Sequence, residues 1–179
     1  MYRPSSMKVW FFALALLLIG PGVAHSQTAK EAMRIGIYDS RAVALAYYNS
    51  APQRRYLQEL QAEYQKAKAT NDENRVKELE ESGPARQEMM HLQVFGGVTI
   101  PNVIAAVRDK LPVIAKDARV VLLVSKWEVT YRDPAIEYVD VTMPLVKLFD
   151  PEDKVLKWIE EMKTQEPIPV DKLPREVKK

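Results

Sequence analysis

The segment that decides the fold is Leu79–Leu92, which reads LEESGPARQEMMHL, because apolar residues on its two sides mirror each other about Gly83-Pro84. The residue numbers of each mirrored pair sum to 167 or 168, and the pairs are Leu79 with Met89, Val76 with Leu92, Ala67 with Ile100, Tyr64 with Ile104, Leu60 with Val107 and Leu57 with Leu111. Two helices that fold back on each other at residue 83 or 84 bring every pair into contact. The pattern therefore predicts a long antiparallel helical hairpin with the apolar spacing of a coiled coil.

This hairpin is expected to span about residues 53–117, and two positions for its tip remain open. One is the mirror axis at residues 82–84. The other is the segment 70–74 (TNDEN), which supplies no apolar residue. We prefer the mirror axis, because a tip at 70–74 folds Tyr64 onto Glu80 and leaves the apolar stripe unpaired. Burial of such a stripe is what stabilises helices of this kind.

Strands are predicted on both sides of the hairpin and would form a base for it. Met33–Asp39 (MRIGIYD) alternates as a strand does, and Asp39 is suited to cap the short helix that follows. Arg119–Ser125 (RVVLLVS) is a continuous apolar run, which predicts a buried strand. Trp127–Tyr131 alternates again, which predicts a half-exposed strand hairpinned to the buried one. Ile136–Val141 is expected to be extended.

The C-terminal third is expected to hold two helices and a tail. A short helix is predicted over residues 143–149, and Asp150-Pro151-Glu152-Asp153 is a strong start for an extra helix at 151–162. Residues 164–179 contain three prolines and many charges, which is typical of disorder. The sequence thus predicts an α+β fold over residues 27–163. Its parts are a small sheet of about three strands within 33–48 and 118–149, a long antiparallel helical hairpin, and C-terminal helices.

Residues 1–26 have the organisation of a secretory signal peptide. Arg3 and Lys8 precede the apolar run Val9–Ile19, and Ala24-His25-Ser26 places small residues at a cleavage site near Ser26. The apolar run has 11 residues, which is short for a bilayer span of roughly 20. A periplasmic location after cleavage is therefore expected, with an uncleaved membrane anchor as the alternative.

Charge and cysteine content narrow the classes of partner. Without Arg3 and Lys8, the chain keeps 24 of its 26 basic residues against 24 acidic ones, so its net charge is zero. This balance does not indicate nucleic-acid binding. Membrane contact stays open, but the charge does not indicate it. The chain has no cysteine, so its stability must come from burial. A hairpin is not compact, and partner subunits are therefore expected.

The order of these elements resembles that of the Skp/OmpH family of periplasmic chaperones. The matching stretches are Ile35–Asp39 with Arg41-Ala42-Val43, Ala115-Lys116-Asp117 leading into Val120–Val124, Val129–Pro134 followed by Val139–Thr142, and Leu145–Leu148. The resemblance implies three chains that join their strands into a β-body, with helical arms around a cavity that shelters unfolded outer-membrane proteins. The chain departs from the family in its shorter arms, which are not basic, since Gln53–Ser82 carries six basic and seven acidic residues.

No catalytic, cofactor or metal site is predicted, and the protein is not expected to be an enzyme. The chain lacks a P-loop, a dinucleotide-binding loop, a paired-histidine motif and a nucleophile elbow. Asp39 and Asp140 follow strands and offer two carboxylates for acid–base work or a metal, but helix capping explains both. His91 has no orienting partner in the sequence, and the segment His91–Gly97 (HLQVFGG) is left without a role.

Two sets of residues are candidates for binding. The apolar residues near the expected tip are candidate client contacts, because methionine adapts to varied partners; they are Val76, Leu79, Met89, Met90, Leu92 and Phe95. The apolar residues of the strands are candidates for the base or a subunit interface; they are Ile35, Ile37, Val121, Leu123, Trp127, Val129 and Tyr131.

From these features we expect an ATP-independent holdase for unfolded outer-membrane or periplasmic proteins. The resemblance implies a homotrimer. The alternative is a periplasmic structural adaptor that docks a folded partner through the helix at 151–162 and the tail.

Overall fold

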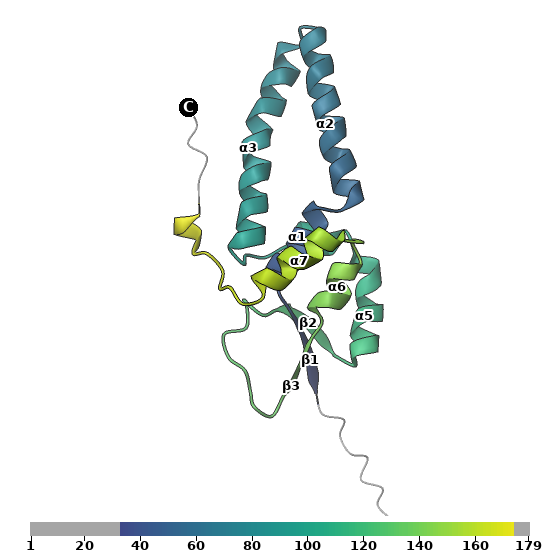
Figure 1. Cartoon of the computed structure of the whole chain (residues 1–179), viewed down its shortest axis with the longest axis vertical. Helices are drawn as coiled ribbons and strands as arrows, with labels where there is room; N and C mark the ends of the chain where they lie inside the picture. The colour runs from purple at the N-terminus through teal and green to yellow at the C-terminus, as the bar shows by residue number, and fades with distance from the viewer. Residues whose placement is uncertain (1–32, 174–179) are drawn as a thin grey trace, which may run out of the picture. The chain divides into compact units, whose positions relative to one another are not determined.

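The computed structural model describes residues 33–173, which form a unit of mixed helix and strand (Figure 1). In chain order its elements are β1 (Arg34–Tyr38), α1 (Ser40–Tyr48), α2 (Ala51–Ala69), α3 (Glu73–Phe95), α4 (Pro101–Ala105), η1 (Arg108–Lys110), α5 (Leu111–Ala118), β2 (Leu122–Ser125), β3 (Glu137–Asp140), α6 (Thr142–Lys147), α7 (Asp153–Met162) and η2 (Val170–Lys172). The expected signal peptide lies outside the described residues. Within 33–173, no helix is long and apolar enough to cross a membrane.

The sheet has three parallel strands in the order β2-β1-β3, with β1 in the centre. Ile35 pairs with Leu122 on one side and with Tyr138 on the other. The prediction of a strand at 127–131 hairpinned to β2 is wrong, because the third strand is β3 and it pairs with β1. Strands β2 and β3 lie on opposite sides of β1, so residues 126–136 carry the chain from one edge of the sheet to the other.

Two further expectations about the sheet need correction. The apolar run 119–125 was expected to be a buried strand, but Val121 is 72% exposed and Leu122 is 52% exposed. Val121 precedes β2 and Leu122 is its first residue, so both stand where this edge strand begins and where the described part of the chain leaves their side chains uncovered. The expected strand at 33–39 is confirmed as β1.

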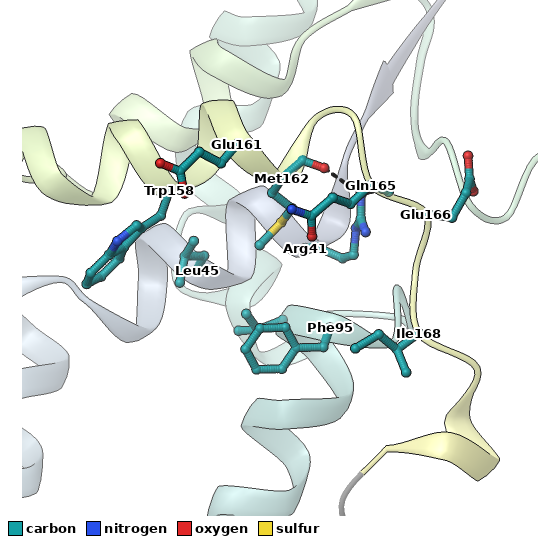
Figure 2. Close-up of a pocket in the computed structure, with 10 residues that line it drawn as sticks. Arg41, Leu45, Phe95, Trp158, Glu161, Met162, Gln165, Glu166 and Ile168 are labelled. Carbon is teal, nitrogen blue, oxygen red and sulfur yellow. Dashed lines mark hydrogen bonds between the residues drawn. The ribbon is translucent and has the colours of Figure 1, made fainter.

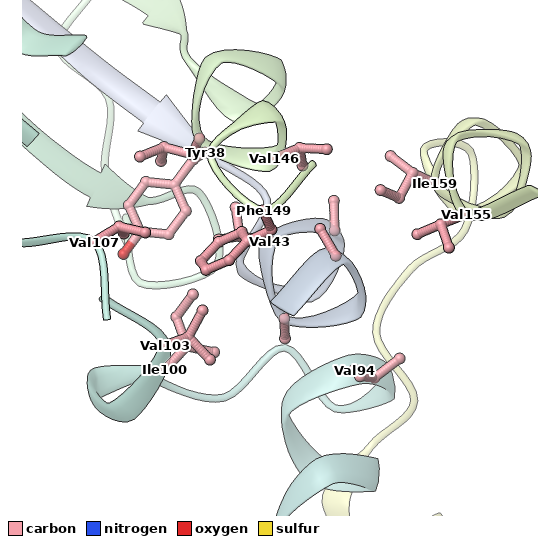
Figure 3. Close-up of a cluster of buried hydrophobic side chains, with 14 of the residues drawn as sticks. Tyr38, Val43, Val94, Ile100, Val103, Val107, Val146, Phe149, Val155 and Ile159 are labelled. Atoms are coloured by element: carbon pink, nitrogen blue, oxygen red, sulfur yellow. The ribbon is translucent and has the colours of Figure 1, made fainter. Parts of the chain in front are cut away.

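The hydrophobic core is built around α1. Its side chains Ala42, Val43, Ala44 and Ala46 are at most 2% exposed, and the helix packs against α3, α4, α6 and α7. Figure 3 shows Val43 and Phe149 near its centre, with Val155 and Ile159 of α7 on one side. The alanines let four helices approach one short helix closely, and the larger side chains fill the spaces between them. Burying each Val, Leu or Ile side chain contributes about 1.5–3 kcal/mol.

The turn between α2 and α3 lies at residues 70–72, not at Gly83-Pro84. Helix α3 runs through both residues to Phe95, so the preferred tip was wrong and the alternative segment is the turn. The polar residues there act as caps: Asn71 adopts a positive φ of 55°, and the Asp72 carboxylate accepts a hydrogen bond of 3.1 Å from the Arg75 amide. Interior proline removes one helical hydrogen bond, and α3 tolerates this at Pro84.

Contacts close to this turn hold α2 and α3 together. Tyr64 donates a 2.7 Å hydrogen bond from its hydroxyl to Glu80, and Arg75 forms an ion pair of 2.9 Å with Glu63. Ala67 and Leu79 are buried between them. The long coiled-coil hairpin over 53–117 is not confirmed, because residues 101–118 form α4, η1 and α5, and Ile100, Val103 and Val107 belong to the main core.

The C-terminal helices are confirmed at α6 and α7. Residues 164–173, which were expected to belong to a disordered tail, continue from α7 and pack against the end of α3. The Ile168 amide donates a 2.9 Å hydrogen bond to the carbonyl oxygen of Phe95, and Leu173 is buried. Gly97 has a φ of 66°, and a Cβ added there would lie 3.0 Å from Pro167. Because Gly97 has no side chain, residues 164–173 can pack closely against the end of the His91–Gly97 segment.

Candidate functional site

A groove of about 450 Å³ opens between the base-side halves of α2 and α3. The residues that line it are Tyr48, Gln53, Tyr56, Leu57, Gly83, Arg86, Gln87, Met89, Met90 and Asn102. Figure 1 shows the two helices meeting at the turn and lying further apart toward α1. The groove therefore begins where the contacts near the turn end.

Apolar side chains on both walls of this groove are open to solvent. Tyr56 is 42% exposed and Leu57 52% exposed on α2, and Met89 is 48% exposed on α3. Apart from the neighbouring residues of α3 itself, a Cβ added to Gly83 would have no atom within 4 Å, so α3 borders open space there. Large apolar residues grouped around a depression are typical of a binding surface, whereas single exposed ones are ordinary.

A polar network closes the end of the groove nearest the base. The Tyr48 hydroxyl donates a 2.7 Å hydrogen bond to the Gln93 side-chain oxygen, and the Gln93 amide donates one of 2.7 Å to Asn102. Gln93 is only 1% exposed, and burial raises the pKa of Tyr48. The network is neutral and its groups are satisfied, so it fixes α1, α3 and α4 without adding charge to the groove.

Arg86 is the charged residue among those that line the groove. Its guanidinium donates a 2.7 Å hydrogen bond to the Ser82 hydroxyl one turn earlier on α3. The amides of Gln53 and Gln87 offer both donors and acceptors on opposite walls. The groove can therefore take an apolar side chain and also bond a nearby peptide group.

A second polar cluster lies at the carboxyl end of β1, around Asp39. The Asp39 carboxylate caps α1 by accepting a 3.0 Å hydrogen bond from the Arg41 amide, as the sequence predicts. It also accepts bonds from the Arg41 guanidinium at 3.0 Å, the Trp127 indole at 2.8 Å and the Lys126 ammonium at 3.0 Å. Burial acts to raise the pKa of Asp39, but these hydrogen bonds outweigh it and hold the pKa below its ordinary value.

Asp39 and Asp140 line the same cavity of about 200 Å³, as their positions after two strands allow. Both carboxylates are occupied, since Asp140 accepts a 2.8 Å hydrogen bond from the Thr142 amide and Asp39 is surrounded by cations. Among residues 33–173, no group of three or more His, Cys, Asp or Glu side chains is placed to hold a metal ion. The geometry of this cluster supports a structural role, because a carboxylate saturated with donors is a poor base.

The structure separates the residues proposed as client contacts. Met89 and Met90 line the groove, whereas Leu79 is buried near the turn beside the half-buried Val76. Leu92 is half-buried, and Phe95 is 43% exposed beside a different cavity. His91 packs its ring 6.0 Å from that of Phe95. The six candidates therefore do not form one surface.

The candidate base residues also differ from one another. Ile35 and Ile37 are half-buried in β1, Leu123 packs against the core, and Val129 is half-buried in the connection to β3. The other three candidates lie elsewhere: Trp127 has the guanidinium of Arg41 4.6 Å from its ring, and Val121 and Tyr131 are among the most exposed apolar side chains described.

Sequence reasoning missed the α2 wall of the groove. Tyr56 was not singled out, and Leu57 was assigned to the apolar stripe of the hairpin. The available signal was the second turn position at 70–74, since a tip there leaves the α2 residues near the base without partners.

No protein-family model matches the chain, and comparison with curated proteins and with solved structures also gives no match.

Proposed function

We propose that the protein is an exported, ATP-independent holdase that binds unfolded polypeptide segments in the groove between α2 and α3. One observation carries the proposal: the groove has exposed apolar side chains on both walls, namely Tyr56 and Leu57 on α2 and Met89 on α3. The resemblance to Skp/OmpH chaperones supports the same class and makes outer-membrane or periplasmic proteins the expected clients.

The chemistry of the groove suits clients of varied sequence. Methionine adapts its shape, and tyrosine offers a large contact area with a polar end, so neither demands a particular partner residue. Each apolar side chain that a client buries contributes about 1.5–3 kcal/mol before the cost of ordering the client is subtracted. Binding at one groove is therefore weak, and several arms acting together would raise it.

The proposal also includes the assembly of several copies of this chain. We propose that α2 and α3 form an antiparallel arm and that three chains join through their sheets, as the resemblance implies. The exposed apolar residues of the outer edge, Val121 and Leu122, support such an interface, because an edge strand with apolar side chains is prone to pairing. The mass of the purified chain by light scattering tests it, and a monomer at micromolar concentration would contradict it.

Light scattering of an unfolded outer-membrane protein on dilution from urea tests the activity. We expect suppression by the wild-type chain and loss of most of it in Leu57→Ser/Met89→Ser. The matched control is Val113→Ser, which removes an apolar side chain that is 58% exposed on α5, away from the groove. Absence of suppression by the wild type, or equal loss in the control, would contradict the proposal.

The adaptor remains the second candidate, and one observation favours it. Trp158 on α7 and Ile168 after it are 46% and 41% exposed, so the C-terminal part presents apolar side chains of its own. An adaptor would keep its function in Leu57→Ser/Met89→Ser and lose it in Trp158→Ser. A holdase acting through the groove would show the reverse pattern in the scattering assay.

A further inference from the structure

We propose that a second cavity, enclosed by α1, the end of α3, α7 and the C-terminal segment, binds a basic side chain of a partner polypeptide. It has a volume of about 350 Å³ and is separate from the groove, since the two share no lining residue. We name it the cation pocket. Its lining residues are Arg41, Leu45, Val94, Phe95, Trp158, Glu161, Met162, Gln165, Glu166 and Ile168.

The pocket has an apolar interior and an aromatic mouth. Leu45, Val94 and Met162 supply the interior, and Figure 2 shows Trp158 and Phe95 on two sides of it. Trp158 is 46% exposed and Phe95 43% exposed, so both rings are available at the mouth. The stem of a lysine or arginine is apolar and fits such an interior, and its charged end is attracted to an aromatic face.

The free charges at the mouth are negative. Glu161 and Glu166 both line the pocket, and neither forms an ion pair among the residues that the structure describes. Glu161 lies one turn after Trp158 on α7, so the two side chains share a face of that helix. The pocket also lies at the C-terminal end of α7, where the helix dipole favours a cation.

The cations near the pocket are already occupied. The Arg41 guanidinium is 3.0 Å from Asp39 and donates to the carbonyl oxygens of Gln165 at 2.8 Å and Met162 at 3.4 Å. Lys163 pairs with Glu160 instead of with Glu161. The charge of the Arg41 guanidinium is balanced by Asp39, so the uncompensated charges among the residues that line the pocket are the carboxylates of Glu161 and Glu166.

The same hydrogen bonds hold the pocket open before any ligand arrives. Arg41 ties α1 to the residues that follow α7, and the Ile168 amide ties the C-terminal segment to Phe95 at 2.9 Å. A pocket whose walls are fixed in advance loses less entropy on binding. This favours recognition of a single side chain even though the contact area is small.

The test uses two peptide probes that differ only in charge. N-acetyl-leucyl-arginine amide carries the guanidinium, and the citrulline analogue has the same shape without the charge. Binding to the purified chain is followed by the indole N–H signal of Trp158 in two-dimensional NMR, assigned with Trp158→Phe. We expect the arginine probe to bind about tenfold more tightly than the citrulline probe, corresponding to about 1.4 kcal/mol.

Charge variants complete the test. Glu161→Gln/Glu166→Gln is expected to abolish most of the preference for arginine, and the control Glu88→Gln, at an exposed position of α3 that lines neither the pocket nor the groove, is expected to keep it. Equal binding of the two probes, no change at Trp158, or the same loss in the control would overturn the proposal. The proposal does not rest on the groove, because Leu57→Ser/Met89→Ser leaves the pocket residues intact and should leave probe binding unchanged.

Discussion

Replacement of Asp39 by asparagine is expected to destabilise the fold strongly while keeping the helix cap. Asparagine caps helices about as well as aspartate, so the change removes mainly the charge. The side chains of Asp39 and Arg41 are 5% and 3% exposed, so the loss leaves a buried guanidinium without its counter-charge. The NH2 group of the new asparagine also faces other donors in either orientation of its side chain. It faces the Arg41 and Lys126 cations in one orientation and the Trp127 indole N–H in the other.

The magnitude follows from the contacts that are lost. Arg41 and Lys126 each donate to the same carboxylate oxygen at 3.0 Å, and a hydrogen bond to a charged group contributes about 1.5–3 kcal/mol. The Lys126 side chain is 27% exposed, which places its share at the lower end. We therefore expect Asp39→Asn to lower the free energy of unfolding by about 3–5 kcal/mol, in line with the cost of breaking other buried ion pairs.

Urea unfolding followed by circular dichroism measures this loss at neutral pH. Asp109→Asn is the matched control, because Asp109 is exposed in η1, and its effect should stay within about 0.5 kcal/mol. The double variant Asp39→Asn/Arg41→Met should cost less than the sum of the two single changes, because it removes both buried partners. A loss below about 1 kcal/mol for Asp39→Asn would refute the reasoning that the cluster stabilises the fold.

The pH dependence of the free energy of unfolding, compared between the wild type and Asp39→Asn, gives an independent check. The pKa of Asp39 is lower in the folded state than its ordinary value of 3.8, so the unfolded chain binds this proton first as the pH falls. The contribution of Asp39 is present above pH 3.8 and declines as the pH drops below it toward the folded-state pKa. Wild-type stability should therefore fall more steeply in this acidic range than that of Asp39→Asn.

Three further changes are measured by the same unfolding assay. Gly83→Ala should change the free energy of unfolding by less than about 1 kcal/mol, because the helical gain of alanine is offset by the clash of its Cβ with the ring of the following Pro84; a larger loss would instead favour a turn at Gly83-Pro84. Gly97→Ala should destabilise it by about 1–3 kcal/mol, since φ is 66° and the new Cβ lies 3.0 Å from Pro167; an unchanged midpoint would contradict the positive φ. Leu145→Ala, at a fully buried position, should cost about 2–5 kcal/mol, whereas Val113→Ala should change little, and equal effects would argue against the core around α1.

Local signals in the sequence predicted the local parts of the fold. The alternation at β1 and the Asp39 cap depend on neighbouring residues, and both are found. Helix α7 also forms, but it begins at Asp153 with Glu152 as its N-cap, so Pro151 lies before the helix instead of at its first position. The pairing of strands was not predictable in the same way. The third strand pairs with β1, about a hundred residues earlier, and the alternation in 127–131 favoured a nearby partner that does not form.

The turn was misplaced because two physical signals competed. The mirror in apolar residues favoured Gly83-Pro84, whereas the caps at Asn71 and Asp72 favoured the actual turn. The caps prevailed because Ile100 and Val107 pack into the core, so they were never available to pair with α2. The groove was missed for the same reason, since α2 residues that were expected to be buried in a hairpin are exposed; Met89 and Met90 are the parts of the site that the sequence identified.

The central position of β1 in the sheet sets the order in which parts of the fold can form. This strand comes near the beginning of the folded unit, but both of its neighbours, β2 and β3, come from residues 122–140. The caps and contacts that join α2 to α3 are local, so they can form early, while closing the sheet requires a long loop and is slow. A chain that emerges from its N-terminus therefore carries β1 with both edges bare until its last third has arrived. Truncation before residue 137 is expected to leave β1 without β3, however well the helices fold.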